Sequence, residues 1–306
     1  MQYGFGAALT WAFDTVILGI ACAMAPFLGS DEAALASAFM HDAACALIML
    51  AFMVFRGRLA DTLAALKTRS GQVVMLAALL GGPLGMSGYL VAINNIGAGY
   101  AAAISAFYPA VGAFLAMVIL KEEMKPRQLV ALFAALIGIV VMGWSSTDSA
   151  TSGNAILGIF GALLCVFGWG SEAVILAWGM QDDSVDDETA LHIRETTSAL
   201  VYGIVVMPLI HGLGLVGSAL ITPANLILIL AALAGTVSYL FYYKGISIIG
   251  ASRCMGLNIS YSAWAVLFSI FLGVFPGPVE IICCIVIIVG TVLSATPDWS
   301  ELGIGK

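Results

Sequence analysis

Charge is what this sequence has least of. Only 9% of its 306 residues are charged, whereas a soluble domain carries about 25%. The shortage runs along the whole chain, and 61% of the residues are hydrophobic, with a mean hydropathy of +1.06. These figures exclude an ordinary soluble domain and predict an integral membrane protein. A cleaved signal peptide is not expected, because the first apolar stretch starts almost at Met1 without a basic segment before it.

Other absences narrow the chemistry. Eleven Lys and Arg residues face 18 Asp and Glu residues, and without a basic face no nucleic-acid partner is expected. The six cysteines form no CxxC pair and the three histidines are scattered, so no metal site, disulfide framework or Ser-His-Asp triad is predicted. We expect neither enzyme activity nor a cofactor. The acidic run "MQDDSVDDETA" (180–190) is interpreted as a solvated loop, and its segment 182–188 has no role that we can assign.

Long apolar runs are what the sequence has instead. A transmembrane helix needs about 20 predominantly apolar residues, and ten stretches meet that length. They cover residues 4–28, 34–55, 73–94, 99–120, 127–146, 154–178, 189–212, 224–244, 252–273 and 277–295. The predicted fold is therefore an all-α integral membrane protein with ten transmembrane helices.

Lys and Arg fall in loops on one side of this arrangement, which is also the side of the N-terminus. They lie between the second and third, the fourth and fifth, and the eighth and ninth predicted helices, and at the chain end. The opposite loops, including "GSDEAA" and "NNIGAG", carry none. The positive-inside rule then predicts that both termini are cytoplasmic.

The two halves of the chain resemble each other. "MHDAACAL" (40–47) aligns with "IRETTSAL" (193–200), and "WAFD" (11–14) aligns with "WGSE" (169–172) at a slightly different offset. The offset of the first pair also aligns Gly82 with Gly235, Tyr89 with Tyr242, and Tyr108 with Tyr261. We predict one repeat over 1–146 and a second over 154–295. Because five helices is an odd number, the second repeat enters the membrane inverted, which is typical of alternating-access transporters with a midplane substrate site.

Four carboxylates lie deep enough within the predicted helices to be expensive in a bilayer: Asp14, Asp42, Glu172 and Glu195. A charge at mid-bilayer costs about 2.5 to 3.5 kcal/mol on insertion scales, so such residues usually face a bundle interior and serve function. Asp42 and Glu195 each follow a histidine or arginine, and local pairing explains them equally well. Glu172 has no cation nearby in sequence. It is predicted to pair with a cationic substrate or a proton, although burial as a neutral acid is an alternative. Glu172, Asp14 and Asp42 are the candidates for proton coupling.

Aromatic residues accompany these carboxylates. Trp169 precedes Glu172 by three residues, and Trp11 precedes Asp14 by three, so each pair shares a helix side. Several deep rings around one carboxylate are typical of a cage for a quaternary ammonium, while plain packing remains the alternative for any single ring. Asn258 is suited to a substrate hydroxyl or to a backbone carbonyl. The predicted substrate-binding residues are Trp11, Tyr89, Tyr108, Trp169, Glu172, Tyr242, Asn258, Tyr261 and Trp264.

Four stretches carry a family resemblance: "GGPLGM", "ISAFYPA", "WGSEAVI" and "GLNISYSAWAVLF". With them the chain resembles the drug/metabolite transporter superfamily in its ten-span form with two EamA-type repeats, and within it the LicB-type bacterial choline permeases. The resemblance implies a choline importer in the bacterial inner membrane that works by alternating access, with proton coupling.

The resemblance also implies that the partners are a small cationic substrate and the lipid bilayer, with the chain acting as a monomer or homodimer. An exporter of amino acids, metabolites or cationic drugs would share the fold and remains the alternative. A scramblase or lipid-headgroup enzyme would need a nucleophile or metal cluster that the sequence does not display. A purely structural subunit would not need intramembrane carboxylates in both repeats.

Overall fold

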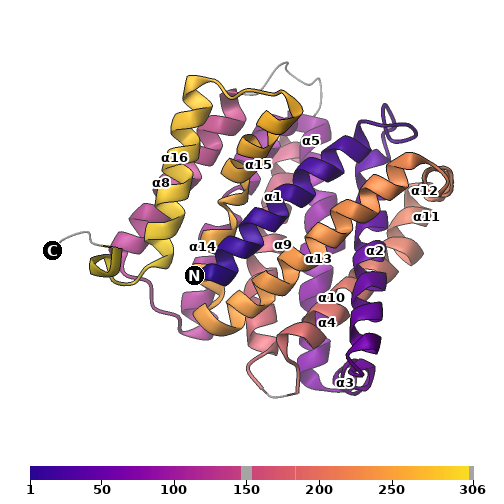
Figure 1. Ribbon diagram of the computed structural model, residues 1–306, viewed down its shortest axis with the longest axis horizontal. Coiled ribbons are helices and arrows are strands. Elements are labelled where there is room, and N and C mark those ends of the chain that lie inside the picture. The colour runs from indigo at the N-terminus through magenta and orange to yellow at the C-terminus, as the bar shows by residue number, and fades with distance from the viewer. Residues whose placement is uncertain (146–153, 183, 303–306) are drawn as a thin grey trace.

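The chain forms a bundle of helices (Figure 1). A computed structural model describes residues 1–145, 154–182 and 184–302. Residue 146, where we placed the end of the fifth helix and of the first repeat, and residue 183 of the acidic loop lie outside the described residues. Within them, all regular structure is helical, which confirms the predicted all-α class.

Nine helices of the described chain are long and apolar enough to cross a membrane, and a bent pair provides a tenth. In chain order they are α1 (Gln2–Cys22), α2 (Ala33–Phe55), α4–η1–α5 (Arg69–Leu79, Leu80–Gly85, Met86–Ile96), α6–α7–η2 (Ala98–Ser105, Tyr108–Leu115, Ala116–Leu120), α8 (Pro126–Ser145), α9 (Ala155–Gly179), the bent pair α10–η3–α11 (Asp187–Val201, Tyr202–Val206, Met207–Leu209) and α12 (Leu213–Leu220), α13 (Pro223–Ile249), α14–α15–η4 (Ala251–Asn258, Tyr261–Ser269, Ile270–Leu272), and α16 (Pro278–Ala295). The short helices α3 (Leu59–Ala65) and η5 (Trp299–Leu302) complete the described structure.

Each predicted span coincides with one of these helices, and the differences lie at the ends. The first span was predicted to reach residue 28, but α1 ends at Cys22, just before Pro26, and a proline disfavours helix in the residue before it. The eighth was predicted to end at 244, but α13 continues to Ile249, where Gly250 at φ 89° ends it. The seventh bends by 119° into α12 at residues 210–212.

The packing pairs helices from opposite halves. α1 packs along α13, and α9, the counterpart of α1 in the second half, packs along α5, the counterpart of α13. α2 packs against its own counterpart α10. Both halves also break one span at the same place: α7 begins at Tyr108 and α15 at the aligned Tyr261. The predicted sequence equivalence therefore has a counterpart in local structure.

The third span contains a π-helical segment, η1, over the sequence "LGGPLG". Pro83 has no backbone N–H and disturbs the hydrogen-bond ladder, which favours such a bulge. Gly81 and Gly82 keep their carbonyl oxygens available for side chains: Gly81 O accepts from Trp169 Nε1 at 3.0 Å, and Gly82 O accepts from the Tyr202 hydroxyl at 3.3 Å. A bulge near the middle of a span thus organises the groups that meet there.

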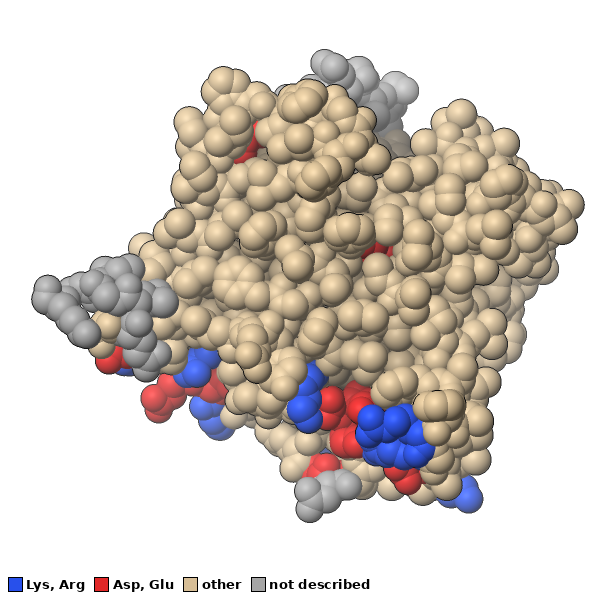
Figure 2. Space-filling model, in the orientation of Figure 1, with Lys and Arg blue, Asp and Glu red and all other residues tan. Residues whose placement is uncertain are grey.

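Lys and Arg mark one end of the bundle, visible as the blue atoms along the lower edge of Figure 2. The helices alternate in direction, so the loops and helix ends that carry these residues share that end. We call it the basic face; it comprises Arg56, Arg58, Lys67, Arg69, Lys121, Lys125, Arg127, Lys244 and Arg253. Among the described residues, Arg194 is the one guanidinium outside it.

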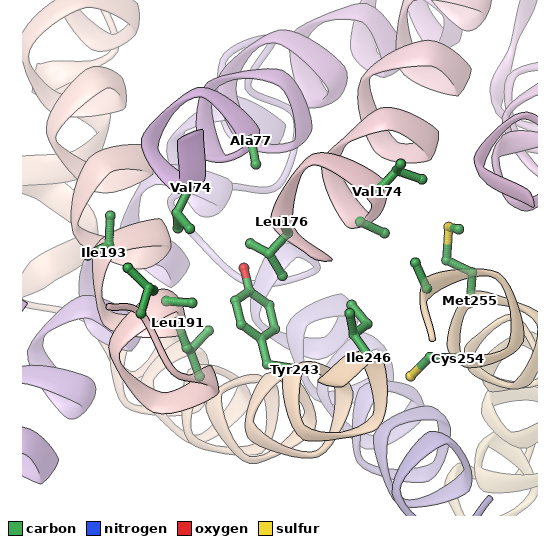
Figure 3. Packing of buried hydrophobic residues seen from close by; sticks show 14 of the residues in the cluster. Val74, Ala77, Val174, Leu176, Leu191, Ile193, Tyr243, Ile246, Cys254 and Met255 are labelled. Carbon is green, nitrogen blue, oxygen red and sulfur yellow. The ribbon is translucent and has the colours of Figure 1, made fainter. Parts of the chain in front are cut away.

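A dense apolar cluster lies just inside the basic face (Figure 3). Side chains from α4, α9, α10, α13 and α14 point toward one another there, and the phenol of Tyr243 lies among them. We call it the basal cluster; its buried members include Met49, Met53, Val74, Val174, Leu176, Leu191, Ile193, Tyr243, Ile246, Cys254 and Met255. The named members are at most 3% exposed, so the basal cluster fills the interior of the bundle next to its basic end.

Candidate functional site

A cavity of about 730 Å³ occupies the middle of the bundle. All of the predicted site residues except Trp264 line it: Trp11, Asp14, Asp42, Tyr89, Tyr108, Trp169, Glu172, Tyr242, Asn258 and Tyr261. Residues far apart in the sequence therefore meet around one space, as expected for a site between two repeats.

The cavity extends from the basal cluster toward the opposite end of the bundle. Tyr108, Tyr239 and Tyr242 line it and also pack against the basal cluster, so they form its floor. On the other side the lining reaches Cys22 at the end of α1 and Glu280 in the first turn of α16. These positions lie at the end of the molecule opposite the basic face, toward which the cavity extends.

One group of rings centres on Trp169. Its ring centroid lies 5.5 Å from that of Tyr89 and 5.8 Å from that of Tyr108, the latter at an interplanar angle of 87°. The indole Nε1 donates to Gly81 O, which fixes the ring orientation. A Cβ at Gly85 would lie 2.9 Å from Trp169 Cδ1, so only glycine leaves the ring its place.

A second group of rings centres on Trp11. Its centroid lies 5.0 Å from Tyr239 and 6.5 Å from Tyr261, both in edge-to-face geometry. Tyr239 is a cavity residue that our predicted set missed. At the repeat offset its counterpart is Met86, so the comparison of the two halves that identified Tyr242 contained no signal for Tyr239.

Trp264 lies outside the cavity lining, unlike Tyr261 on the same helix. Three residues along a helix rotate a side chain by about 60° from the starting direction, and this is enough to move Trp264 past the edge of the cavity. Its Nε1 is buried without a hydrogen-bond partner among the described residues, and so is Oδ1 of Asn258, which does line the cavity. Asn258 thus brings a polar amide to the cavity wall, with its Oδ1 atom buried behind the surface.

Glu172 meets a cation that sequence proximity does not reveal. Arg194 on α10 places Nε 3.1 Å from Glu172 Oε1. The other carboxylate oxygen, Oε2, lies against the backbone of η1, where a Cβ at Gly81 would approach it to 1.8 Å. The missing side chain at Gly81 therefore creates the space that Glu172 occupies.

Arg194 also joins two further carboxylates. Nη1 lies 3.1 Å from Glu195 Oε2 and 3.4 Å from Asp42 Oδ2, and the Ser198 hydroxyl donates to the same Asp42 oxygen at 2.6 Å. The local pairing of Arg194 with Glu195 that the sequence suggested is present, but contacts across helices accompany it. Glu195 Oε1 is buried without a hydrogen-bond partner in the described part of the chain.

His41 continues the chain of polar groups. Its Nε2 lies 3.1 Å from Asp14 Oδ1, and its Nδ1 lies 3.4 Å from Asp42 Oδ1. A continuous chain of contacts thus leads from Asp14 through His41, Asp42 and Arg194 to Glu172. With four carboxyl groups around one guanidinium and one imidazole, the cluster has acid in excess, which favours the uptake of cations or protons.

Comparisons with known proteins agree with this architecture. The EamA-like transporter family matches residues 1–144 and again residues 156–296. The chain belongs to the EamA-like transporter family. The two matches confirm the predicted pair of EamA-type repeats and the resemblance to the drug/metabolite transporter superfamily.

Two similar proteins narrow the classification of this EamA-like chain, one by its sequence and one by its fold. It is 28% identical over 192 residues to protein LicB of Haemophilus influenzae, a match that spans 62% of this chain and 63% of that protein. A solved crystal structure superposes with a TM-score of 0.72 over 96% of both chains at 18% identity, a level that supports the fold alone. The chain is thus a LicB-like, multi-pass member of a transporter family.

Proposed function

We propose that this protein imports choline or a similar quaternary ammonium cation by alternating access. One observation carries the proposal: Trp169, with Tyr89 and Tyr108 around it, lines the same cavity as the carboxylate of Glu172. The similarity to LicB supports the same choice of substrate.

The chemistry of the lining suits a trimethylammonium group. Such a group has no N–H to donate, so ordinary acceptors cannot select it. An aromatic face within about 6 Å attracts it by about 0.5 to 2 kcal/mol, and a carboxylate offsets the loss of its hydration. The amide of Asn258, which lines the same cavity, is suited to the hydroxyl of choline.

The charge distribution supports an orientation in the membrane, and the membrane potential supports import as the proposed direction. With the basic face in the cytoplasm, both termini are cytoplasmic, the two repeats are inverted, and the cavity faces outward while the basal cluster closes the inner side. The exchange of helix partners between the halves supports such an inverted pair. In a bacterial inner membrane, the potential then favours entry of a cation by about 2.3 kcal/mol per 100 mV.

We also propose that transport is coupled to protons, which bind to carboxylates of the cluster around Arg194 and His41. Glu172, Asp14 and Asp42 are the proton-carrying candidates, and His41 links the last two. Choline accumulation in proteoliposomes should then depend on an inward proton gradient at fixed membrane potential. Equal accumulation with and without that gradient would rule out coupling and leave potential-driven uptake. The complete cavity lies within one chain, so a monomer suffices, and a homodimer would contain two such sites.

Equilibrium binding of labelled choline to purified protein tests the substrate. We expect saturable binding by the wild type, and large losses in Trp169→Ala and Glu172→Gln. Trp178→Ala is the matched control, because Trp178 lies on the same helix α9 but stacks under Arg69 near the basic face, with the guanidinium carbon 5.2 Å from its ring. An absence of choline binding by the wild type would refute the substrate and favour an exporter of another compound.

A further inference from the structure

The cation that occupies the proposed substrate site is a side chain of the protein itself. Arg194 lines the cavity, places Nε on Glu172, and holds its guanidinium carbon 4.7 Å from the ring centroid of Tyr239. A carboxylate and an aromatic face are the two elements expected around a bound quaternary ammonium. Arg194 therefore already satisfies the groups that a substrate cation would need.

The partners of Arg194 differ in how open they are to the cavity. Its own side chain is 5% exposed, that of Glu172 is 17% exposed, that of Asp42 11% and that of Glu195 0%. Glu172 is thus the partner that an incoming cation reaches most easily. Glu195 and Asp42 both approach Nη1, away from the Nε that faces Glu172.

This geometry lets Arg194 release one carboxylate without losing its counter-charge. If the Nε contact breaks, Nη1 keeps Glu195 and Asp42, and Nη2 keeps its hydrogen bond to the Tyr239 hydroxyl at 3.1 Å. Breaking a buried ion pair is costly mainly because it leaves a charge uncompensated. Here the guanidinium stays compensated, and the substrate cation compensates Glu172.

We propose that Arg194 is a tethered stand-in for the substrate, which pairs with Glu172 in the empty transporter and yields that carboxylate when the cation binds. This inference rests on the proposed function. It makes Arg194 a positioning residue that changes both the affinity for the substrate and the rate of turnover. Binding is a cation exchange at Glu172, so affinity for the substrate is reduced by the strength of the internal pair.

A second consequence concerns the return of the empty carrier. To import again, the cavity must pass through a closed, water-poor state without substrate, and an unpaired carboxylate disfavours such a state. Arg194 keeps Glu172 paired during this step, whereas the substrate does so during the loaded step. Net uptake requires both steps, but exchange of external for internal substrate requires only the loaded one.

Purified full-length protein in proteoliposomes separates these modes. Net uptake of labelled choline is driven by an inside-negative diffusion potential, and counterflow is measured against unlabelled internal choline. In Arg194→Gln we expect counterflow to survive, net uptake to fall about tenfold or more, and the Kd for choline to drop about fivefold, within the usual range of coupling between sites. Arg127→Gln is the control, since Arg127 contacts Pro297 O and Asp298 at the chain periphery.

Arg194→Lys provides a second variant that retains the charge. Lysine lacks the planar fork that joins three carboxylates, so we expect tighter choline binding than in the wild type, with net uptake and counterflow both preserved. Two results would overturn the stand-in role of Arg194: equal loss of both transport modes in a folded Arg194→Gln protein, or unchanged choline affinity in Arg194→Lys. The proposed function would still stand as long as the wild-type protein transported choline. If wild-type protein transported no choline in either mode, the proposed function would fail, and this inference with it.

Discussion

The replacement of Gly81 by alanine isolates the contribution of Glu172 without removing its charge. A Cβ built at Gly81 lies 1.8 Å from Glu172 Oε2 and 2.0 Å from Cδ. Ordinary contact needs about 3.4 Å or more, so the carboxylate must move by about 1.5 Å. Because the atoms it meets end a flexible side chain, the movement displaces Glu172 rather than the backbone, and Gly81→Ala should fold normally.

The magnitude follows from the displacement. At an effective dielectric constant of about 20, moving a carboxylate from about 4 Å to about 5.5 Å from a unit positive charge costs about 1 kcal/mol. The Kd for choline should therefore rise about sixfold, with a larger loss where the aromatic contacts are disturbed as well. The assay is equilibrium binding of labelled choline at constant pH, with thermal unfolding in detergent as a check on the fold.

Gly19→Ala is the matched control for this substitution. Gly19 also lines the cavity, but nothing lies within 4 Å of a Cβ placed there. We expect wild-type affinity and unchanged or slightly increased stability, since alanine is the better helix former. If Gly81→Ala bound choline as the wild type does, Glu172 would not be the group that compensates the substrate, and the reasoning from its position would be refuted.

Three further substitutions test other parts of the structure. Trp169→Phe keeps a ring but loses the hydrogen bond to the π-helical segment, so choline affinity should fall about fivefold, less than in the alanine variant. Gly88→Ala brings a Cβ within 2.7 Å of a backbone oxygen of α9 and should lower the unfolding temperature, because neither backbone can yield cheaply. Burial alone would raise the pKa of Asp186, but hydrogen bonds from Thr189 and Arg58 outweigh it and lower the pKa below its usual value. The stability this supplies is present above about pH 4 and lost as the pH falls further, and Asp186→Asn should weaken that acid dependence in thermal unfolding.

The helices could be predicted well because the lipid bilayer imposes a simple length rule on the sequence. A stretch of about 20 apolar residues has few alternatives, so the described spans coincide with the predicted ones. Where the ends differ, a local feature decides: Gly250, with a positive φ, ends α13 at Ile249 rather than at Lys244. The bend after Leu209 was not predicted. His211 adopts a left-handed conformation there, and a histidine by itself does not indicate such a conformation.

The site could be predicted only as far as the two halves repeat each other. Tyr108 and Tyr261 are aligned in sequence and occupy equivalent helix starts in the structure. The contact between Glu172 and Arg194 joins α9 to α10 across residues that carry no common pattern. Ion pairs between helices depend on rotation and register, which an apolar sequence of low complexity specifies weakly. The functional chemistry of the cavity therefore emerged from packing, although its residue types were visible beforehand.

Alternating access makes opposite predictions for two native cysteines. Cys22 lines the outer part of the cavity, whereas Cys254 is fully buried in the basal cluster. In proteins that retain a single cysteine, a water-soluble maleimide should label Cys22 and spare Cys254 at rest. During choline turnover, opening of the basal cluster should accelerate labelling at Cys254 and slow it at Cys22. Cys284, buried with Ala263 in a separate cluster, is the control and should not respond. Labelling of Cys254 that stays constant while choline is transported would mean that the substrate leaves by a path that does not open the basal cluster.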